Sequence, residues 1–124
     1  MTYDLLPAEL REFLARNIDS IAQLEALLLL RGAQGEIWHA PNAAKRLYIG
    51  EQEALETLAH LMERGFLVRE GGGFRFYPQS AELSRSVELL AEHYRRHLIP
   101  ITNLIHAKPR RIRQFAEAFK LKKD

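Results

Sequence analysis

The sequence NAAKRLYIGEQEALETLAHLMERGFLVREGGGFRF, which spans residues 42–76, decides the fold. Residues 42–50 predict a short helix that ends in a turn at Ile49 and Gly50, because glycine favours turns. Residues 51–64 predict a longer helix, which Gly65 ends. Two stretches with strand-forming residues, 66–70 and 74–77, flank the three glycines 71–73, which predicts a β-hairpin with a tight turn. The apolar side chains of the longer helix that share one face by spacing are Leu55, Leu58, Ala59 and Met62.

This order of helix, turn, helix and hairpin resembles a winged helix-turn-helix domain of the kind found in bacterial transcription regulators. The resemblance covers about residues 20–78 and depends on pattern. Many winged domains have a short strand before the second helix, and residues 36–39 can form it, after which Pro41 or Asn42 opens that helix. The resemblance implies a mainly α fold with a small two-stranded antiparallel β-wing, extended by helices at both ends.

Two helices are expected before the short strand. Pro7 suits the first turn of a helix, where its missing N–H costs nothing, and an apolar stripe continues to about Arg16. Asp19 or Ser20 can cap the next helix, since a short polar side chain accepts hydrogen bonds from the first N–H groups. That helix runs to Arg31 and is apolar nearly all round in its last turn, so we expect it to be buried.

A further helix is expected after the hairpin, with Ser80 as its cap and its end near Leu98. Pro100 should end or kink this helix, and an apolar pattern then continues to Ala107. One face of the helix can either pack on the first helix of the chain or form a homodimer, and we weigh the two equally. The apolar residues of that face are Leu83, Val87, Leu90, Tyr94 and Leu98.

The composition is that of an ordinary soluble protein and predicts one domain. The chain has 124 residues, of which 47% are hydrophobic and 27% charged, and it has no cysteine. Disulfides, thiol catalysis and cysteine-ligated metal sites are therefore excluded. The first residues lack the basic and apolar regions of a signal peptide, and no apolar run approaches the ~20 residues that span a membrane, so we expect a cytoplasmic protein. The basic C-terminal helix can dock on its own domain or lie on an anionic membrane surface, and its short apolar face makes membrane binding the less favoured alternative.

Charge divides the chain at residue 108. Residues 108–124 carry seven lysines and arginines against two carboxylates, a net charge of +5, so the remaining 107 residues carry −3. We therefore distinguish a winged-helix domain with flanking helices over residues 1–107 from a basic amphipathic helix or tail over residues 108–124. A basic total charge is for this reason no argument for nucleic-acid binding by the domain itself.

DNA binding is the first functional hypothesis, because the resemblance implies that residues 51–64 enter the major groove. Gln52 and Thr57 can then read bases, His60 is exposed on the same helix by position, and cations before the turn, on the wing and in the tail can contact phosphates. The candidate nucleic-acid-binding residues are Lys45, Arg46, Gln52, Thr57, His60, Arg69, Arg75, Arg110, Arg111 and Arg113.

A protein-interaction module is the second hypothesis. Residues 51–64 contain four glutamates and one arginine, so the helix that should approach DNA would repel phosphates. A domain that has lost DNA contacts can bind a partner through this acidic helix or through the amphipathic C-terminal helix. The candidate partner-binding residues are Glu53, Glu56, Ile112, Phe115 and Phe119.

An enzyme is not expected, and neither is a cofactor. His93 and His97 lie four residues apart, a spacing that can bind a metal on a helix, but no third ligand or neighbouring general base accompanies them. Glu53 and Glu56 lie on an open helix face, so they do not predict acid–base catalysis. We therefore expect no metal and no catalytic residue.

Overall fold

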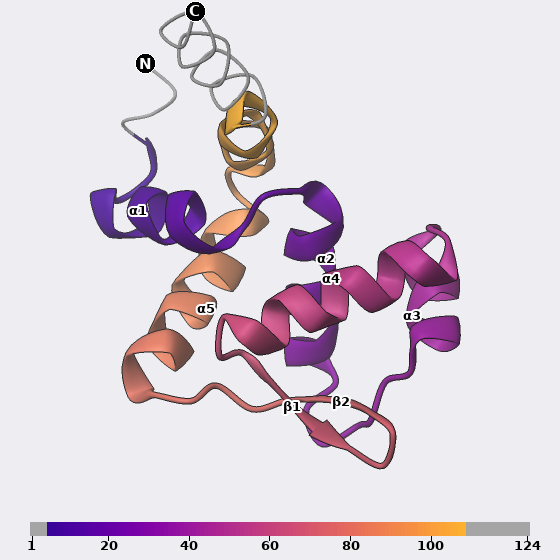
Figure 1. Ribbon diagram of the computed structural model, residues 1–124. Helices are drawn as coiled ribbons and strands as arrows, with labels where there is room; N and C mark the ends of the chain where they lie inside the picture. Colours follow the sequence, from indigo (N-terminus) through magenta and orange to yellow (C-terminus); the bar gives the residue numbers. More distant parts are fainter. Residues whose placement is uncertain (1–4, 109–124) are drawn as a thin grey trace, which may run out of the picture.

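A computed structural model describes residues 5–108, and it is mainly helical with one two-stranded antiparallel sheet (Figure 1). The α-rich fold with a small β-hairpin is therefore confirmed. Residues 98–108 are also helical. The named elements are α1 (Ala8–Asn17), α2 (Ile21–Gly32), α3 (Ala40–Leu47), α4 (Glu51–Glu63), β1 (Leu67–Glu70), β2 (Gly73–Phe76) and α5 (Ala81–Tyr94).

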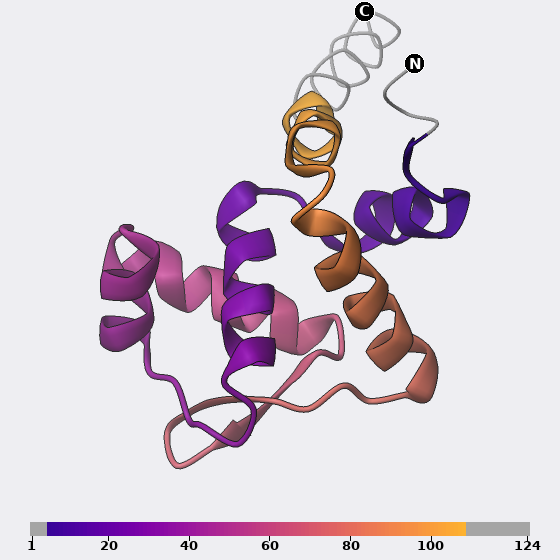
Figure 2. The ribbon, with the colours of Figure 1, turned by 180° about the vertical axis from the view of Figure 1, so that it is seen from behind.

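The core surrounds α2, which lies between α5 on one side and α3 on the other, while α4 crosses behind it (Figure 2). Leu24, Leu27 and Leu30 of α2 are completely buried, and α2 packs against α3, α4 and β2. The expectation of a buried second helix is confirmed. Ser20 caps α2 as predicted, since its Oγ accepts a hydrogen bond from the Gln23 N–H at 3.2 Å.

The hairpin turns through Gly71 and Gly72, whose φ angles are 56° and 76°. Two successive left-handed residues define the turn that suits a two-residue hairpin, and glycine adopts them without a Cβ clash. A third segment joins the sheet at one residue, because Trp38 forms an isolated antiparallel bridge with Phe74. The Trp38 N–H donates to the Phe74 carbonyl at 2.7 Å, and the Phe74 N–H donates back at 2.8 Å.

Two boundaries differ from the prediction. Helix α3 begins at Ala40, before Pro41 and Asn42, because the Asn42 side chain accepts the His39 N–H at 2.7 Å and makes His39 the N-cap. Helix α5 ends at Tyr94, so the predicted extension to Leu98 is wrong. Pro100 instead lies in the first turn of the helix over residues 98–108, where its missing N–H leaves no hydrogen bond unmade.

The predicted homodimer face is mostly internal. Val87 and Leu90 are fully buried, Leu83 and Tyr94 are half-buried, and α5 packs against α1. Of the two alternatives for this face, the structure therefore has intramolecular packing, which leaves Val87 and Leu90 inaccessible to a second copy. Leu98 is exposed, but it belongs to the next helix.

Lys108 ties the last described helix to the end of α1. Its Nζ donates hydrogen bonds to the carbonyl oxygens of Leu14, Ala15 and Ile18 at 3.2, 2.8 and 2.6 Å, and it lies 2.8 Å from Asp19 Oδ1. The last carbonyls of a helix have no partner within the helix and attract positive charge. Lys108 thus caps α1 from a position 90 residues away in the sequence.

Replacing Gly73 with alanine should destabilise the protein, because a Cβ there would lie 2.6 Å from the Trp38 carbonyl oxygen and 2.8 Å from Ile37 Cγ2. The bridge to Trp38 would have to move, and we expect a loss of about 1–3 kcal/mol in the free energy of unfolding. Urea unfolding followed by the fluorescence of Trp38, the single tryptophan, measures this loss.

Gly32→Ala is the matched control, since an added Cβ at Gly32 meets no atom within 4 Å. It should leave the urea midpoint unchanged or raise it slightly. Equal midpoints for the two variants would contradict the constraint assigned to the bridge.

Candidate interaction surface

Helix α4 divides its residues between the core and three exposed strips. The buried face consists of Ala54, Thr57, Leu58 and Leu61. The predicted face was therefore rotated by part of a turn, and Leu55, with 40% of its surface exposed, does not belong to the core. Ala54, Leu58 and Leu61 keep the helical i, i+4, i+7 spacing, so the error lay in which apolar set faces inward.

The outermost strip of α4 is polar and acidic. Gln52, Glu56 and Glu63 lie opposite the buried face by helical spacing, and all are exposed. The Gln52 side chain donates to Glu56 Oε1 at 3.1 Å. Glu51 and Leu55 lie beside this strip on one flank. We call these five residues the acidic ridge: Glu51, Gln52, Leu55, Glu56 and Glu63.

The other flank of α4 faces α1, and it is structural. His60 Nε2 donates to the Asn17 carbonyl oxygen at 2.8 Å, and Arg64 Nε donates to Asn17 Oδ1 at 3.0 Å. Glu53 begins the same flank. The partner-binding candidates Glu53 and Glu56 consequently lie on different strips of the helix.

Two of the nucleic-acid-binding candidates on α4, Thr57 and His60, are not on its outermost strip. Thr57 is 5% exposed, so the prediction that it faces outward is wrong, because the buried face of α4 lies one residue away from the predicted one. His60 is half-buried and bonded to α1. Of the three nucleic-acid-binding candidates on α4, Gln52 alone lies on its outermost strip.

Two of the arginines predicted to contact phosphates near the wing, Arg46 and Arg69, instead lie over aromatic rings of the protein. The Arg46 guanidinium lies over the Trp38 ring at 5.6 Å, and the Arg69 guanidinium lies over the Phe74 ring at 4.7 Å. Trp38, Phe74 and Arg69 are directly paired across neighbouring strands, so their side chains share one face of the sheet. Lys45 precedes Arg46 on α3 and is exposed. Arg46 and Arg69 therefore cover one aromatic pair from α3 and from the wing.

Arg75 points to the opposite face of the wing. It follows Phe74 in β2 and is paired with Val68, and successive residues of a strand alternate between faces. Its guanidinium forms an ion pair with Glu70 at 3.1 Å and lies 5.3 Å from the Tyr77 ring centroid. Arg69 and Arg75 thus lie on opposite faces of the sheet and do not form one basic surface.

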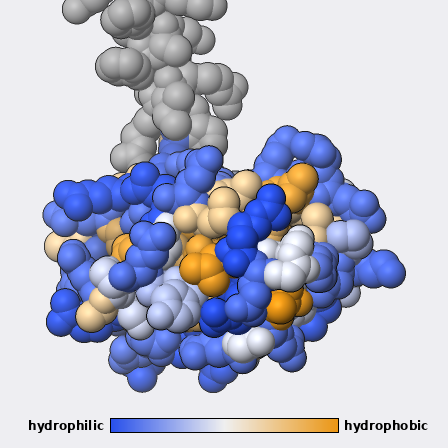
Figure 3. Space-filling model, turned by 60° about the horizontal axis from the view of Figure 1, so that its bottom comes forward, coloured by the Kyte–Doolittle hydropathy of each residue, from blue (hydrophilic) through white to orange (hydrophobic). Residues whose placement is uncertain are grey.

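Figure 3 shows the side of the molecule that carries the hairpin, where hydrophilic surface surrounds small separate apolar areas.

The remaining candidates, Arg110, Arg111, Arg113, Ile112, Phe115 and Phe119, lie outside the described residues.

The side chains of His93 and His97 lie next to each other. The His93 and His97 ring centroids are 5.9 Å apart, and His93 Nδ1 is 3.0 Å from the Leu89 carbonyl oxygen. Within residues 5–108, no group of three or more histidine and carboxylate side chains is placed to hold a metal ion. Among the same residues, no helix has the length and apolarity needed to cross a membrane.

Comparisons of the chain with protein-family models, with curated proteins and with solved structures found no match.

Replacing Asn17 with alanine should cost about 1–3 kcal/mol of stability, since it removes two side-chain hydrogen bonds from a buried position. The Asn17 Nδ2 group donates to the Phe13 carbonyl at 3.0 Å, and its Oδ1 holds Arg64. Urea unfolding measures the cost. Asn103→Ala, at an exposed helical position, is the control and should change stability by less than about 0.5 kcal/mol. Similar values for both variants would show that α4 is not anchored through Asn17.

Proposed function

We propose that the chain is a winged helix-turn-helix domain that serves as a protein-interaction module, and that its acidic ridge binds a cationic surface of a partner protein. The observation that carries this proposal is the composition of the ridge, which has three carboxylates, one amide and an exposed leucine, and no cation. On the neighbouring flank, the hydrogen-bond donors Arg64 and His60 are turned to α1, where they hold Asn17.

The order and packing of the elements support the winged-helix assignment. Helix α2 is followed by the bridging residue Trp38, then by α3 and α4, then by the hairpin, which is the order that the resemblance implies. Helices α3 and α4 pack on each other and are joined by only three residues, 48–50. The helix that would approach a ligand in this arrangement is α4.

The charge of the ridge favours a protein over DNA. Affinity for duplex DNA depends on lysines and arginines that neutralise phosphates, and carboxylates at the same place repel them. A partner with lysines or arginines around an apolar side chain instead complements both the glutamates and Leu55. Tyr48, the first residue of the turn between α3 and α4, is 94% exposed and offers a second apolar contact.

A DNA-binding transcription regulator is the alternative, and Arg46 and Arg69 favour it. Their guanidinium groups lie over neighbouring aromatic rings on the same side of the wing, with Lys45 one residue before Arg46. Arginines held in this way lose less conformational freedom when they contact phosphates. A salt titration separates the two functions.

Binding to a random-sequence DNA duplex, measured by fluorescence anisotropy between 50 and 200 mM salt, should be weaker than about 10⁻⁴ M throughout, because non-specific DNA-binding proteins reach about 10⁻⁴–10⁻⁶ M at physiological salt. Micromolar binding that falls steeply with salt would contradict the proposal and support the regulator. Arg110, Arg111 and Arg113 would then be replaced together by alanine. If the tail contacts phosphates, the slope should flatten by about one unit per lost contact.

A synthetic helical peptide of leucine and lysine is the direct probe for the ridge. Amide chemical shifts should move along α4 on titration, and Glu51→Gln with Glu56→Gln should weaken the affinity about five- to tenfold, since each lost exposed charge contact is worth up to about 1 kcal/mol.

Glu36→Gln with Glu82→Gln is the matched control, because these exposed glutamates change the net charge equally but lie away from the ridge. Equal weakening by both pairs, or shifts centred elsewhere, would mean that the peptide responds to net charge and not to the ridge.

A further inference from the structure

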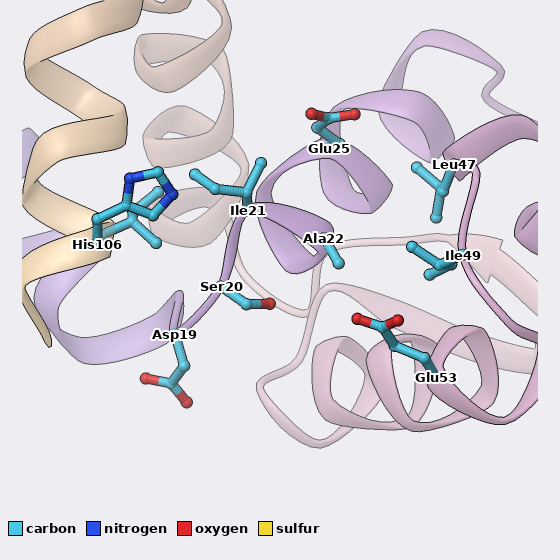
Figure 4. A pocket seen from close by; sticks show the side chains of 10 residues that line it. Asp19, Ser20, Ile21, Ala22, Glu25, Leu47, Ile49, Glu53 and His106 are labelled. Carbon is cyan, nitrogen blue, oxygen red and sulfur yellow. The ribbon is translucent and has the colours of Figure 1, made fainter. Parts of the chain in front are cut away.

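An apolar cavity of about 450 Å³ opens on the side of α4 away from Leu55. Its floor consists of Ile21 and Ala22 of α2, of Leu47 and Ile49 at the turn between α3 and α4, and of Ile105 of the last described helix. Figure 4 shows Leu47 and Ile49 on one side of the cavity and Ile21 on the other side, beside His106, with Ala22 between them. The volume lies within the range of about 300–1,000 Å³ that is typical of ligand pockets, so it can hold more than one side chain.

Carboxylates surround this apolar floor. Asp19, Glu25 and Glu53 line the cavity together with His106 (Figure 4). Neither Glu25 nor Glu53 has an ion-pair partner among residues 5–108. Burial, and secondarily the Glu25 carboxylate, raise the pKa of the Tyr94 phenol above its ordinary value. An occupant of this cavity must therefore combine apolar side chains with positive charge.

The chain itself continues from the edge of the cavity. Lys108 is bound to Asp19, which lines the cavity, and Ile105 and His106 line it from the same helix. The next 16 residues, 109–124, have the required composition. Ile112, Phe115 and Phe119 recur at the i, i+3, i+7 spacing of one helix face. The cations around that face are Arg110, Arg111, Arg113, Lys120, Lys122 and Lys123.

We propose that residues 110–121 fold back onto their own chain as an amphipathic helix, place Phe115 and its apolar neighbours in this cavity, and bring their cations to Glu25 and Glu53. A helix of 12 residues is about 18 Å long, which suits a single cavity between packed helices. Attachment at the edge favours the same chain over a second copy, because a short linker gives an effective concentration in the millimolar range. The inference goes beyond the proposed function and does not depend on it, since the cavity and the acidic ridge lie on opposite flanks of α4.

A spin label tests this docking without interference, because the chain has no cysteine. The variant Lys120→Cys is labelled with a nitroxide in the otherwise intact chain. The methyl signals of Ile21, Leu47 and Ile49 should lose intensity relative to the reduced label, while those of residues far from the cavity, such as Val68 on the wing, should not. Unchanged intensities at the cavity would overturn the proposal.

The same label distinguishes the same chain from a second copy. Spin-labelled chains without isotope are mixed with isotope-labelled chains that carry no nitroxide. If docking is intramolecular, the cavity signals in the mixture keep their intensity. Loss of intensity in the mixture, equal to that in the single-chain experiment, would assign the cavity to a second copy and overturn the proposal.

Side-chain variants test the chemistry of docking. Phe115→Ala with Phe119→Ala should restore the intensities, and so should Glu25→Lys with Glu53→Lys. The control, Glu36→Lys with Glu82→Lys, makes the same change in net charge away from the cavity and should leave the loss of intensity in place. Each variant is accepted only if the methyl signals of the buried core keep their positions. Persistent loss of intensity without the phenylalanines would overturn the proposed apolar contact.

Discussion

The arrangement of the helices depends on the carbonyl groups at the C-terminal end of α1. Three of them accept hydrogen bonds from Lys108 Nζ, and the Asn17 carbonyl accepts one from His60. Unpaired carbonyls at a helix end must find donors, and here the donors come from α4 and from the last described helix. One helix end therefore binds side chains from both elements. The cavity lies beside the same helix end, because Asp19 lines it and also binds Lys108.

These contacts also explain why the surface chemistry departs from what the resemblance implies. A helix that reads DNA needs cations and hydrogen-bond donors on its outer side. The donors His60 of α4 and Arg64 at its C-terminal end are instead bonded to Asn17 of α1. The outer side keeps carboxylates and a leucine, and the wing cations are divided between two faces of the sheet. Because His60 and Arg64 are bonded to Asn17, these donors are not available to contact a nucleic acid.

The sequence predicts the elements that depend on local chemistry. Ser20, Ser80 and the turn glycines act on their immediate neighbours, and their roles were predicted correctly. The errors have both distant and local origins. The buried position of Thr57 depends on how α4 packs against α2, whereas the start of α3 at Ala40 depends on the local cap between His39 and Asn42. The cavity could not be predicted, because its lining comes from α2, from the turn before α4 and from residues 105–106, and no sequence spacing connects them.

Tyr48 ends α3 with a φ of 58°, a left-handed conformation that favours glycine, and its ring is almost fully exposed. Such a conformation costs an ordinary residue about 1–2 kcal/mol, and the ring recovers little of this through burial. Stability alone would therefore select a glycine at this position. A tyrosine at this position is explained if its exposed ring contacts another molecule. Replacing Tyr48 with glycine should then raise the thermostability of the domain and weaken that binding. Engineering of this domain thus meets a trade-off at a single surface side chain.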